Sequence, residues 1–264
     1  MSSRNSQANK AAAREKLRAE RERQAKKDKA RRQVIVAGAV VAALALAGGI
    51  GYLVVQNTKP TAWEAAATAT LVKPKNTTGD NGTTVVIGKA DAKKTLELYE
   101  DSRCPACAQF EQTVGDQVKK DIDAGKFKLQ YFGATFIDNA SSGVGSKNAL
   151  SALGAALDVS PEAFLEYKAA LYSTANHPDE RDDAFAKDAA LLKVADQVAA
   201  LKGNAAFKKA VEDGTYDRWA LEMSKAFNTS GVTGTPTLKM DGKKIETPQT
   251  LEAYNTALDA ALKG

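Results

Sequence analysis

The two cysteines of the chain, Cys104 and Cys107, stand where a predicted strand is followed by a predicted helix. Alternating residues at 95–99 predict the strand. Apolar residues every three or four positions over 104–123 predict the helix, with Gly125 as its C-cap. The start of a helix is positively polarised, so a thiol placed there ionises more readily. The pattern therefore predicts a redox-active dithiol.

Other roles for these cysteines are less well supported by the sequence. A structural zinc site needs four ligands, and the chain offers two cysteines and a single histidine, His177. A static disulfide across so short a loop would restrain the unfolded chain little. A thiol hydrolase that pairs Cys104 with His177 would leave the second cysteine unexplained. We therefore expect a dithiol that cycles, with no metal and no bound cofactor.

The basic charge of the chain is concentrated in its N-terminal tail, residues 1–33. Positions 1–32 carry 12 Lys and Arg against 4 Asp and Glu, which leaves 25 against 28 for the rest. A tail rich in Ala, Arg, Glu and Lys suits a helix on an anionic cytoplasmic membrane surface better than a nucleic-acid-binding arm. We expect no nucleic acid partner.

Residues 34–55 form a run of 22 positions without a charge. At a rise of about 1.5 Å per residue, such a helix crosses a bilayer core of about 30 Å. Basic residues flank only its N-terminal side, which predicts a cytoplasmic N-terminus. A cleaved signal peptide is the alternative, because 45–48 has the small residues of a cleavage site. We predict an uncleaved, single-pass signal anchor in the cell membrane, with the catalytic domain outside the cytoplasm, where disulfides persist.

The exported part begins with residues 56–82, where large apolar side chains are few and Thr, Asn, Gly and Pro are common. This composition predicts a flexible linker, and Trp63 within it would lie at the membrane interface. The remaining residues, 83–264, suffice for one domain. Its first predicted strands are 84–87, 95–99 and 127–132.

An alanine-rich region between about 140 and 230 has helical spacing, with breaks that leave room for three or four helices. The pair Ser160–Pro161 marks the start of one of them, as N-cap and first helical residue. Further on, a strand ends at Met240 and Asp241–Gly242 predicts a hairpin turn. A final helix is predicted between 247 and 262.

A CPxC helix after a strand, followed far downstream by Thr-Pro, a strand, a hairpin and a helix, resembles the thioredoxin superfamily. Within it, the chain is most similar to the DsbA-like thiol-disulfide oxidoreductases. The stretch 88–105 looks like the start of their domain, and Gly-Thr-Pro-Thr at 234–237 looks like their cis-proline loop. The 103 residues between Phe132 and Pro236 match their helical insertion. The resemblance implies an α/β, thioredoxin-like fold with an inserted helical domain, here preceded by the single transmembrane helix.

The resemblance also implies roles for the residues of the motif. Cys104 would be the exposed attacking sulfur, and Cys107 would be the more buried resolving thiol one helical turn later. Pro105 and Ala106 would tune the redox potential between them. The central pair lacks the histidine of the strongest oxidants, which implies a less extreme potential.

Two further implications concern the surroundings of the dithiol. Pro236 would follow a cis peptide bond, and the backbone of Thr235 would pair with an extended substrate segment. The family commonly has a buried acid six residues before the first cysteine, but Leu98 stands there. Strand alternation should turn Glu97 to the opposite face, and we expect Glu100 at the strand end. Proton transfer would then use water or another group.

The expected activity is disulfide exchange with the thiols of exported proteins, in the direction of oxidation. A membrane protein linked to quinone would reoxidise the dithiol. A reductase or isomerase of the same fold is the first alternative, because four residues do not reveal a redox potential. A redox-inert, anchored binding or chaperone module is the second.

Overall fold

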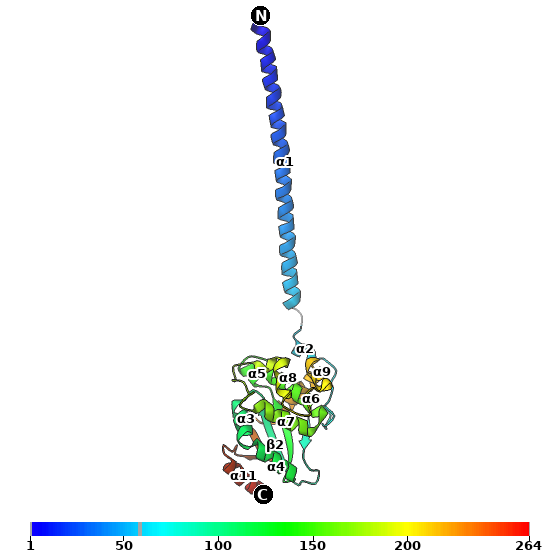
Figure 1. The fold of residues 1–264 in the computed structure, drawn as a ribbon, viewed down its shortest axis with the longest axis vertical. Helices are drawn as coiled ribbons and strands as arrows, with labels where there is room; N and C mark the ends of the chain where they lie inside the picture. Colours follow the sequence, from blue (N-terminus) through cyan, green and yellow to red (C-terminus); the bar gives the residue numbers. More distant parts are fainter. Residues whose placement is uncertain (1, 58–59, 264) are drawn as a thin grey trace. The chain divides into compact units, whose positions relative to one another are not determined.

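The computed structural model describes residues 2–57 and 60–263, without the side chains of residues 2–13, 36, 37, 40, 43 and 47–57. The chain separates into two units, Met1–Thr61 and Ala62–Gly264 (Figure 1). Helix α1, Ser2–Asn57, makes up the first unit. The second unit contains the sheet, the other helices and both cysteines.

Helix α1 includes the backbone of the predicted transmembrane segment, 34–55. Many side chains of this segment lie outside the described residues, and those that are described are exposed. Within the part of the chain that the structure describes, no helix has an apolar stretch long enough to cross a bilayer.

The described residues of the second unit form a five-stranded sheet in the order β1-β3-β2-β4-β5. The central strands β2 (Thr95–Asp101) and β3 (Lys128–Ala134) are parallel. Antiparallel to them lie β1 (Val85–Ile87), beside β3, and β4 (Thr237–Met240), beside β2. The hairpin strand β5 (Lys243–Ile245) forms one edge. The three strands predicted before the insertion are confirmed, and two of them end two residues later than predicted.

The predicted redox helix is confirmed as three consecutive segments. These are α3 (Pro105–Phe110), a π-helical turn η1 (Glu111–Gly115) and α4 (Asp116–Ala124). Gly125 ends the helix in the left-handed conformation, with φ of 78°, as expected of a glycine C-cap. The π-helical turn changes the direction of the side chains that follow it, compared with an unbroken α-helix.

The helical insertion contains more helices than the three or four predicted. Its described elements are α5 (Ile137–Ala140), α6 (Gly145–Val159), α7 (Pro161–Tyr172), the 3₁₀ turn η2 (Ala184–Ala186), α8 (Asp188–Ala195), α9 (Ala205–Glu212) and α10 (Asp217–Thr229). The predicted number of helices was too small because helices of four to eight residues are too short to be told apart by the spacing of their apolar residues. Ser160 is confirmed as the N-cap of α7, since its hydroxyl accepts the N–H of Ala163 at 3.0 Å.

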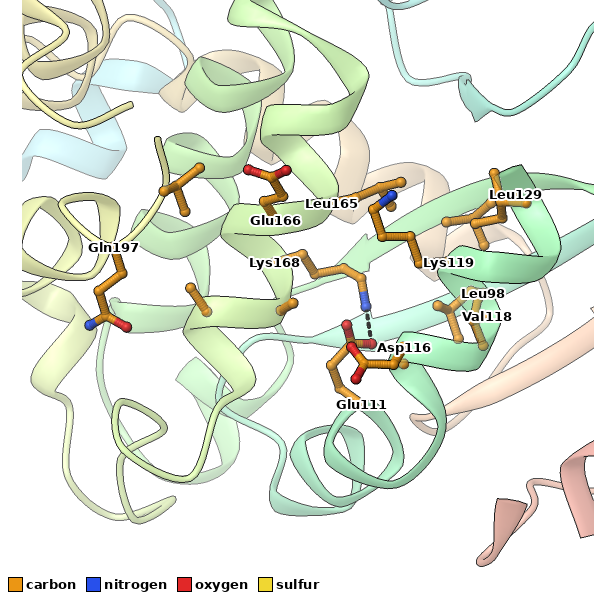
Figure 2. A pocket seen from close by; sticks show the side chains of 15 residues that line it. Leu98, Glu111, Asp116, Val118, Lys119, Leu129, Leu165, Glu166, Lys168 and Gln197 are labelled. Atoms are coloured by element: carbon orange, nitrogen blue, oxygen red, sulfur yellow. Dashed lines mark hydrogen bonds and ion pairs between the residues drawn. The ribbon is translucent and has the colours of Figure 1, made fainter. Parts of the chain in front are cut away.

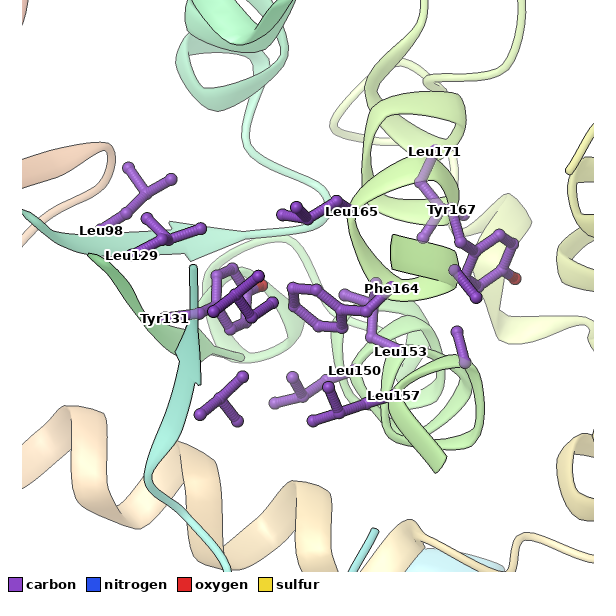
Figure 3. Close-up of a cluster of buried hydrophobic side chains, with 14 of the residues drawn as sticks. Leu98, Leu129, Tyr131, Leu150, Leu153, Leu157, Phe164, Leu165, Tyr167 and Leu171 are labelled. Carbon is purple, nitrogen blue, oxygen red and sulfur yellow. The ribbon is translucent and has the colours of Figure 1, made fainter. Parts of the chain in front are cut away.

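The main core lies between the sheet and helices α6 and α7 (Figure 3). Tyr131 of β3 meets Phe164 of α7 edge to face, with ring centroids 5.0 Å apart. Gly133 of β3 lies against Leu150 of α6, where an added Cβ would come within 2.3 Å of a methyl carbon. Leu98 of β2 belongs to the same cluster. The insertion and the sheet therefore share one core.

The prediction of a flexible linker over 56–82 is wrong from Ala62 onward. The residues from Ala62 belong to the second unit, where they begin with a short helix α2 (Ala62–Ala66). Trp63 and Leu71 are partly buried and pack against the main core.

Hydrogen bonds fix the rest of this segment to the insertion. Asn76 Nδ2 donates to the carbonyl of Leu157 at 2.7 Å, and Trp219 Nε1 donates to the carbonyl of Gly82 at 2.7 Å. The segment is therefore held largely by polar contacts. A count of its apolar side chains does not reveal them.

The C-terminal part of the fold agrees with prediction. Asp241 and Gly242 both have positive φ, 49° and 81°, and they join β4 to β5 in a tight hairpin. The last helix, α11 (Leu251–Lys263), follows. The hydroxyl of Tyr254 donates to Asp121 of α4 at 3.0 Å, which fixes the last helix to the redox helix.

Candidate active site

Cys104 occupies the N-cap position of α3, just after the end of β2. Its N–H donates to the carbonyl of Asp101 at 2.9 Å, and its own carbonyl accepts the N–H of Ala108 at 3.0 Å. Pro105 is the first helical residue, where its fixed φ suits the helix and its missing N–H leaves no bond unmade. The strand end and the helix start together hold the sulfur of Cys104 in place.

The sulfur of Cys104 is less exposed than the resemblance implies. Cys104 is 6% exposed and Cys107 is 0% exposed, and neither forms a disulfide in the described chain. The two cysteines pack in a small apolar cluster with Ala108, Ile137 and Tyr172, which explains the low exposure. Cys104 is still the more accessible of the two, as expected of an attacking sulfur.

The two thiols lie in opposite electrostatic environments. A hydrogen bond from the Cys107 thiol is the largest of the effects that lower the pKa of Cys104 to about 6, despite its burial. Contacts with the Thr235 side chain and with the N–H groups of Ala106 and Cys107 act in the same direction. For Cys107, burial first, then the bond to Cys104 and the charge of Glu100, raise the pKa well above its usual value. At neutral pH, Cys104 is therefore a thiolate while Cys107 keeps its proton.

The loop before β4 reaches this site from the far end of the domain sequence. Its Thr235–Pro236 peptide bond is cis, as the resemblance implies. The carbonyl oxygen of Thr235 lies 3.5 Å from Sγ of Cys104. Thr235 Oγ1 is buried, and the contact of its side chain with Cys104 helps to lower the pKa of that thiol. The structure thus brings this loop to the CPAC turn, in which Pro105 and Ala106 separate the two cysteines.

Arg103, which the sequence analysis did not identify, is fully buried directly before Cys104. Its Nη1 lies 3.1 Å from a carboxylate oxygen of Asp138 and 3.0 Å from one of Asp183, and its Nη2 donates to the carbonyl of Glu180 at 2.8 Å. All three partners belong to the insertion, so the guanidinium connects the insertion to the turn before the cysteines. No sequence signal marks these partners, because the nearest is 35 positions away.

Glu100 is a second buried charged residue whose surroundings the sequence analysis did not predict. It lies one residue before the end of β2, close to the strand end where we expected it, and it is fully buried. Its carboxylate is 3.1 Å from Lys168 Nζ on α7. The same nitrogen is 2.5 Å from Glu111 (Figure 2). Burial raises the pKa of Glu100 to about 7, and the nearby Glu111 adds to this against the opposing effect of Lys168. Strand alternation was the available signal, because positions 98 and 100 share one face.

His177 lies near the site without joining it. Its ring stacks on Tyr172, with centroids 5.9 Å apart, and burial lowers its pKa. Its Nε2 has no hydrogen-bond partner among the described residues, so the structure contains no dyad of His177 and Cys104. Within the same residues, no group of three or more His, Cys, Asp and Glu side chains is arranged to hold a metal ion.

Comparison with known proteins gives the family. The sequence profile described as Thioredoxin matches residues 80–260, which is most of the chain. The chain belongs to the thioredoxin family. Residues 80–260 include the CPAC turn, the cis-proline loop and the whole insertion.

Relatives and solved structures place this thioredoxin-family protein among the DsbA-like members. Disulfide bond formation protein D of Bacillus subtilis (strain 168) is 23% identical over 180 residues, covering 68% of this chain and 77% of that protein. Oxidised DsbA of Mycobacterium tuberculosis has 26% identity and a TM-score of 0.58, covering 69% of this chain and 93% of that chain. MdbA of Actinomyces oris, with 22% identity and a TM-score of 0.59 over 71% of this chain and 91% of its own, shares the fold. The protein is a DsbA-like thiol-disulfide oxidoreductase.

Proposed function

We propose that this thioredoxin-family protein oxidises the thiols of exported proteins, with Cys104 and Cys107 as the exchanging pair. A substrate thiolate attacks Sγ of Cys104 in the Cys104–Cys107 disulfide, which forms a mixed disulfide and releases Cys107 as a thiolate that takes up a proton. A second substrate thiolate then attacks the substrate sulfur of the mixed disulfide, which forms the substrate disulfide and releases Cys104. The substrate loses two electrons and the dithiol gains them, with no bound cofactor.

The unequal thiols are the observation that supports oxidation over reduction. The reduced protein is stabilised when Cys104 is a thiolate, and its pKa of about 6 keeps it ionised at neutral pH. A stabilised thiolate is also a good leaving group from the mixed disulfide. Both effects favour transfer of the disulfide to the substrate.

The cis-proline loop would hold the substrate beside the reacting sulfur. An extended substrate segment would pair with the backbone of Thr235, as a strand adds to the edge of a sheet.

Equilibration with glutathione tests the direction of electron flow. We expect a potential between about −270 mV, typical of thioredoxin, and about −120 mV, typical of the strongest DsbA oxidants. A potential at or below that of thioredoxin would refute the oxidase and favour a reductase of the same fold. A Cys104→Ser variant that keeps full activity in cells would instead favour the redox-inert binding or chaperone module.

We further propose that residues 34–55 of α1 anchor the protein in the cell membrane, with the basic tail in the cytoplasm and the catalytic domain outside. The uncharged run and the one-sided basic flank support this location. Among the described side chains, Val34, Ile35, Val41, Leu44 and Leu46 are large, apolar and exposed on the helix, as lipid-facing residues would be. The full chain should stay with membranes after alkaline carbonate extraction, and its complete release would contradict the anchor.

A membrane protein linked to quinone would restore the Cys104–Cys107 disulfide. Replacing the resolving thiol in a Cys107→Ala variant should trap mixed disulfides on Cys104, in membranes and with exported substrates. Mass spectrometry of the trapped species identifies both kinds of partner. A Cys104→Ser variant is the matched control, and species that also form in it do not come from the exchange reaction.

A further inference from the structure

Asp101 contacts both the turn that carries Cys104 and the start of the insertion. It is the last residue of β2 and is fully buried. Its Oδ1 accepts the backbone N–H of Arg103 at 3.0 Å, and its Oδ2 accepts the backbone N–H of Ile137 at 3.2 Å. Its backbone carbonyl accepts the N–H of Cys104 at 2.9 Å. One residue therefore joins the strand end, the turn and helix α5, which begins at Ile137.

These contacts fix two sides of the space around the Cys104 sulfur. A carboxylate that accepts the N–H two residues later forms an Asx turn, which sets the direction of the chain as it enters Cys104. On the other side, Ile137 packs with Cys104 and Cys107 in the small apolar cluster. A shift of the Asp101 carboxylate would therefore move both the sulfur and the apolar side chain beside it.

A closed ring of hydrogen bonds holds the Asp101 carboxylate in place. The hydroxyl of Ser146, on helix α6, donates to Oδ1 of Asp101 at 2.6 Å. The backbone N–H of Ser146 donates to Asp138 at 2.8 Å, and Asp138 also accepts Nη1 of Arg103 at 3.1 Å. The N–H of Arg103 then closes the ring at Asp101. All four residues are buried, so water does not compete for these bonds.

The ring joins segments that are far apart in the sequence. Ile137 and Ser146 follow Asp101 by 36 and 45 positions. They belong to α5 and α6, the first two helices of the insertion (Figure 1). The insertion thus bonds directly to the carboxylate that shapes the turn before Cys104.

The donors around Asp101 fit a carboxylate and do not fit an amide. Burial raises the pKa of Asp101 to about 6, against the lowering effects of its bonds with Ser146, Arg103 and Ile137. At neutral pH the group is therefore ionised, and both of its oxygens only accept hydrogen bonds. In an asparagine, the NH₂ group would face the backbone N–H of Arg103 or that of Ile137, whichever oxygen it replaced. At least one backbone N–H would then lose its acceptor.

We propose that Asp101 is a positioning residue for thiol-disulfide exchange, which holds the Cys104 sulfur at the helix start and against Ile137. The carboxylate acts on the sulfur through the backbone of Arg103 and Ile137. Through its bonds to Ile137 and Ser146, the insertion takes part in orienting the attacking sulfur. The inference rests on Cys104 as the exchanging sulfur, and it holds for either direction of electron flow.

Asp101→Asn in the reduced full-length protein tests this role. A sulfur that moves away from Cys107 and from the helix N-terminus loses contacts that stabilise its thiolate. The pH midpoint of Cys104 alkylation by iodoacetamide should therefore rise by about one unit. The equilibrium constant with glutathione should shift by about tenfold toward the disulfide form of the protein, which corresponds to about 30 mV.

Ser146→Ala is a milder variant of the same ring. It removes one donor to Asp101 and keeps both backbone bonds, so it should raise the alkylation midpoint by about half a unit. Circular dichroism and urea denaturation show whether each variant is folded. If Asp101→Asn does not fold, Ser146→Ala decides the question alone.

Asp217→Asn is the matched control. Asp217 lies on α10, outside the ring, and it is also an acid whose pKa is raised by burial against the effect of a serine, here Ser151. Its variant should keep the alkylation midpoint and the glutathione equilibrium of the unmodified protein. This result would separate the role of Asp101 from a general loss of stability.

Two outcomes would count against the proposal in different ways. A midpoint near that of a free cysteine, about 8.5, in the unmodified protein would refute the stabilised thiolate of Cys104 and this inference with it. A low midpoint that is the same in the unmodified protein and in the folded ring variants would overturn the positioning role of Asp101 alone.

Discussion

The carbonyl oxygen of Thr235 lies 3.5 Å from Sγ of Cys104, although 131 positions separate the two residues in the sequence. The contact joins the loop before β4 to the start of the redox helix, because β2 and β4 are neighbours in the sheet. The attacking sulfur is therefore held between a helix N-terminus and the loop proposed to bind the substrate.

The pKa of the Cys104 thiol should lie far below that of an ordinary cysteine. Its pKa of about 6 predicts that alkylation by iodoacetamide rises through pH 6 and is nearly constant above pH 8. Removing the Cys107 thiol, the largest cause of the shift, should move this midpoint upward in a Cys107→Ala variant. The alkylated residue is identified by mass spectrometry. A midpoint near that of a free cysteine, about 8.5, would show that the site does not stabilise the thiolate.

Arg103→Met should destabilise the fold strongly. The substitution leaves Asp138 buried without its guanidinium partner, and breaking such a pair typically costs about 3–5 kcal/mol. The free energy of unfolding is measured by urea denaturation. Arg181→Met is the matched control, since Arg181 is exposed in the same part of the insertion and its loss should cost less than about 0.5 kcal/mol. Equal stability of the two variants would mean that the buried network contributes little.

A fragment that begins at residue 83 should be less stable than one that begins at residue 62. The shorter fragment loses the hydrogen bonds of Asn76 to Leu157 and of Trp219 to Gly82, together with the packing of Trp63. Each buried hydrogen bond contributes about 1 kcal/mol, so we expect a loss of about 3 kcal/mol with the packing included. Urea denaturation of both fragments measures the difference. Identical midpoints would restore the view of this segment as a free linker.

Glu100→Gln should remove part of the pH dependence of stability. The pKa of Glu100 is about 7 in the folded protein and 4.5 in the reference state, so the folded protein binds an extra proton between these values. Its contribution to stability therefore falls as pH rises from about 4.5 to 7, by up to about 3 kcal/mol. Urea denaturation at pH 5 and pH 7 should show a smaller fall in Glu100→Gln than in the unmodified protein. Glu97→Gln should keep the full fall, and equal slopes in all three proteins would contradict the shifted pKa.

The secondary-structure elements that could be predicted from the sequence are those marked by a pattern of neighbouring residues. The strand, CPAC turn and helix followed from alternation, helical spacing and Gly125, and the hairpin followed from Asp241–Gly242. The resemblance supplied the cis-proline loop, since no local pattern places residues 235 and 236 beside Cys104. These features are set by short-range preferences or by a motif, so one sequence suffices to find them.

The parts that could not be predicted depend on distant partners. Arg103 and Lys168 are charged residues of ordinary appearance in the sequence, and only the tertiary fold buries them beside the acids that compensate them. Residues 62–82 pack on the domain through backbone and amide groups, which leave no apolar pattern. Glu100 was within reach of the alternation argument, but the predicted strand ended two residues early and excluded it.

The position of Lys168 on α7 has a consequence for attempts to make this protein smaller. Deleting the insertion to obtain a minimal thioredoxin would leave two acids beside the dithiol with no cation to balance them. A minimal version would need neutral residues at positions 100 and 111, and its dithiol would then work without the charges that surround it here. The charges around the dithiol thus come both from the thioredoxin-like part and from the inserted helices, and neither part can be exchanged alone.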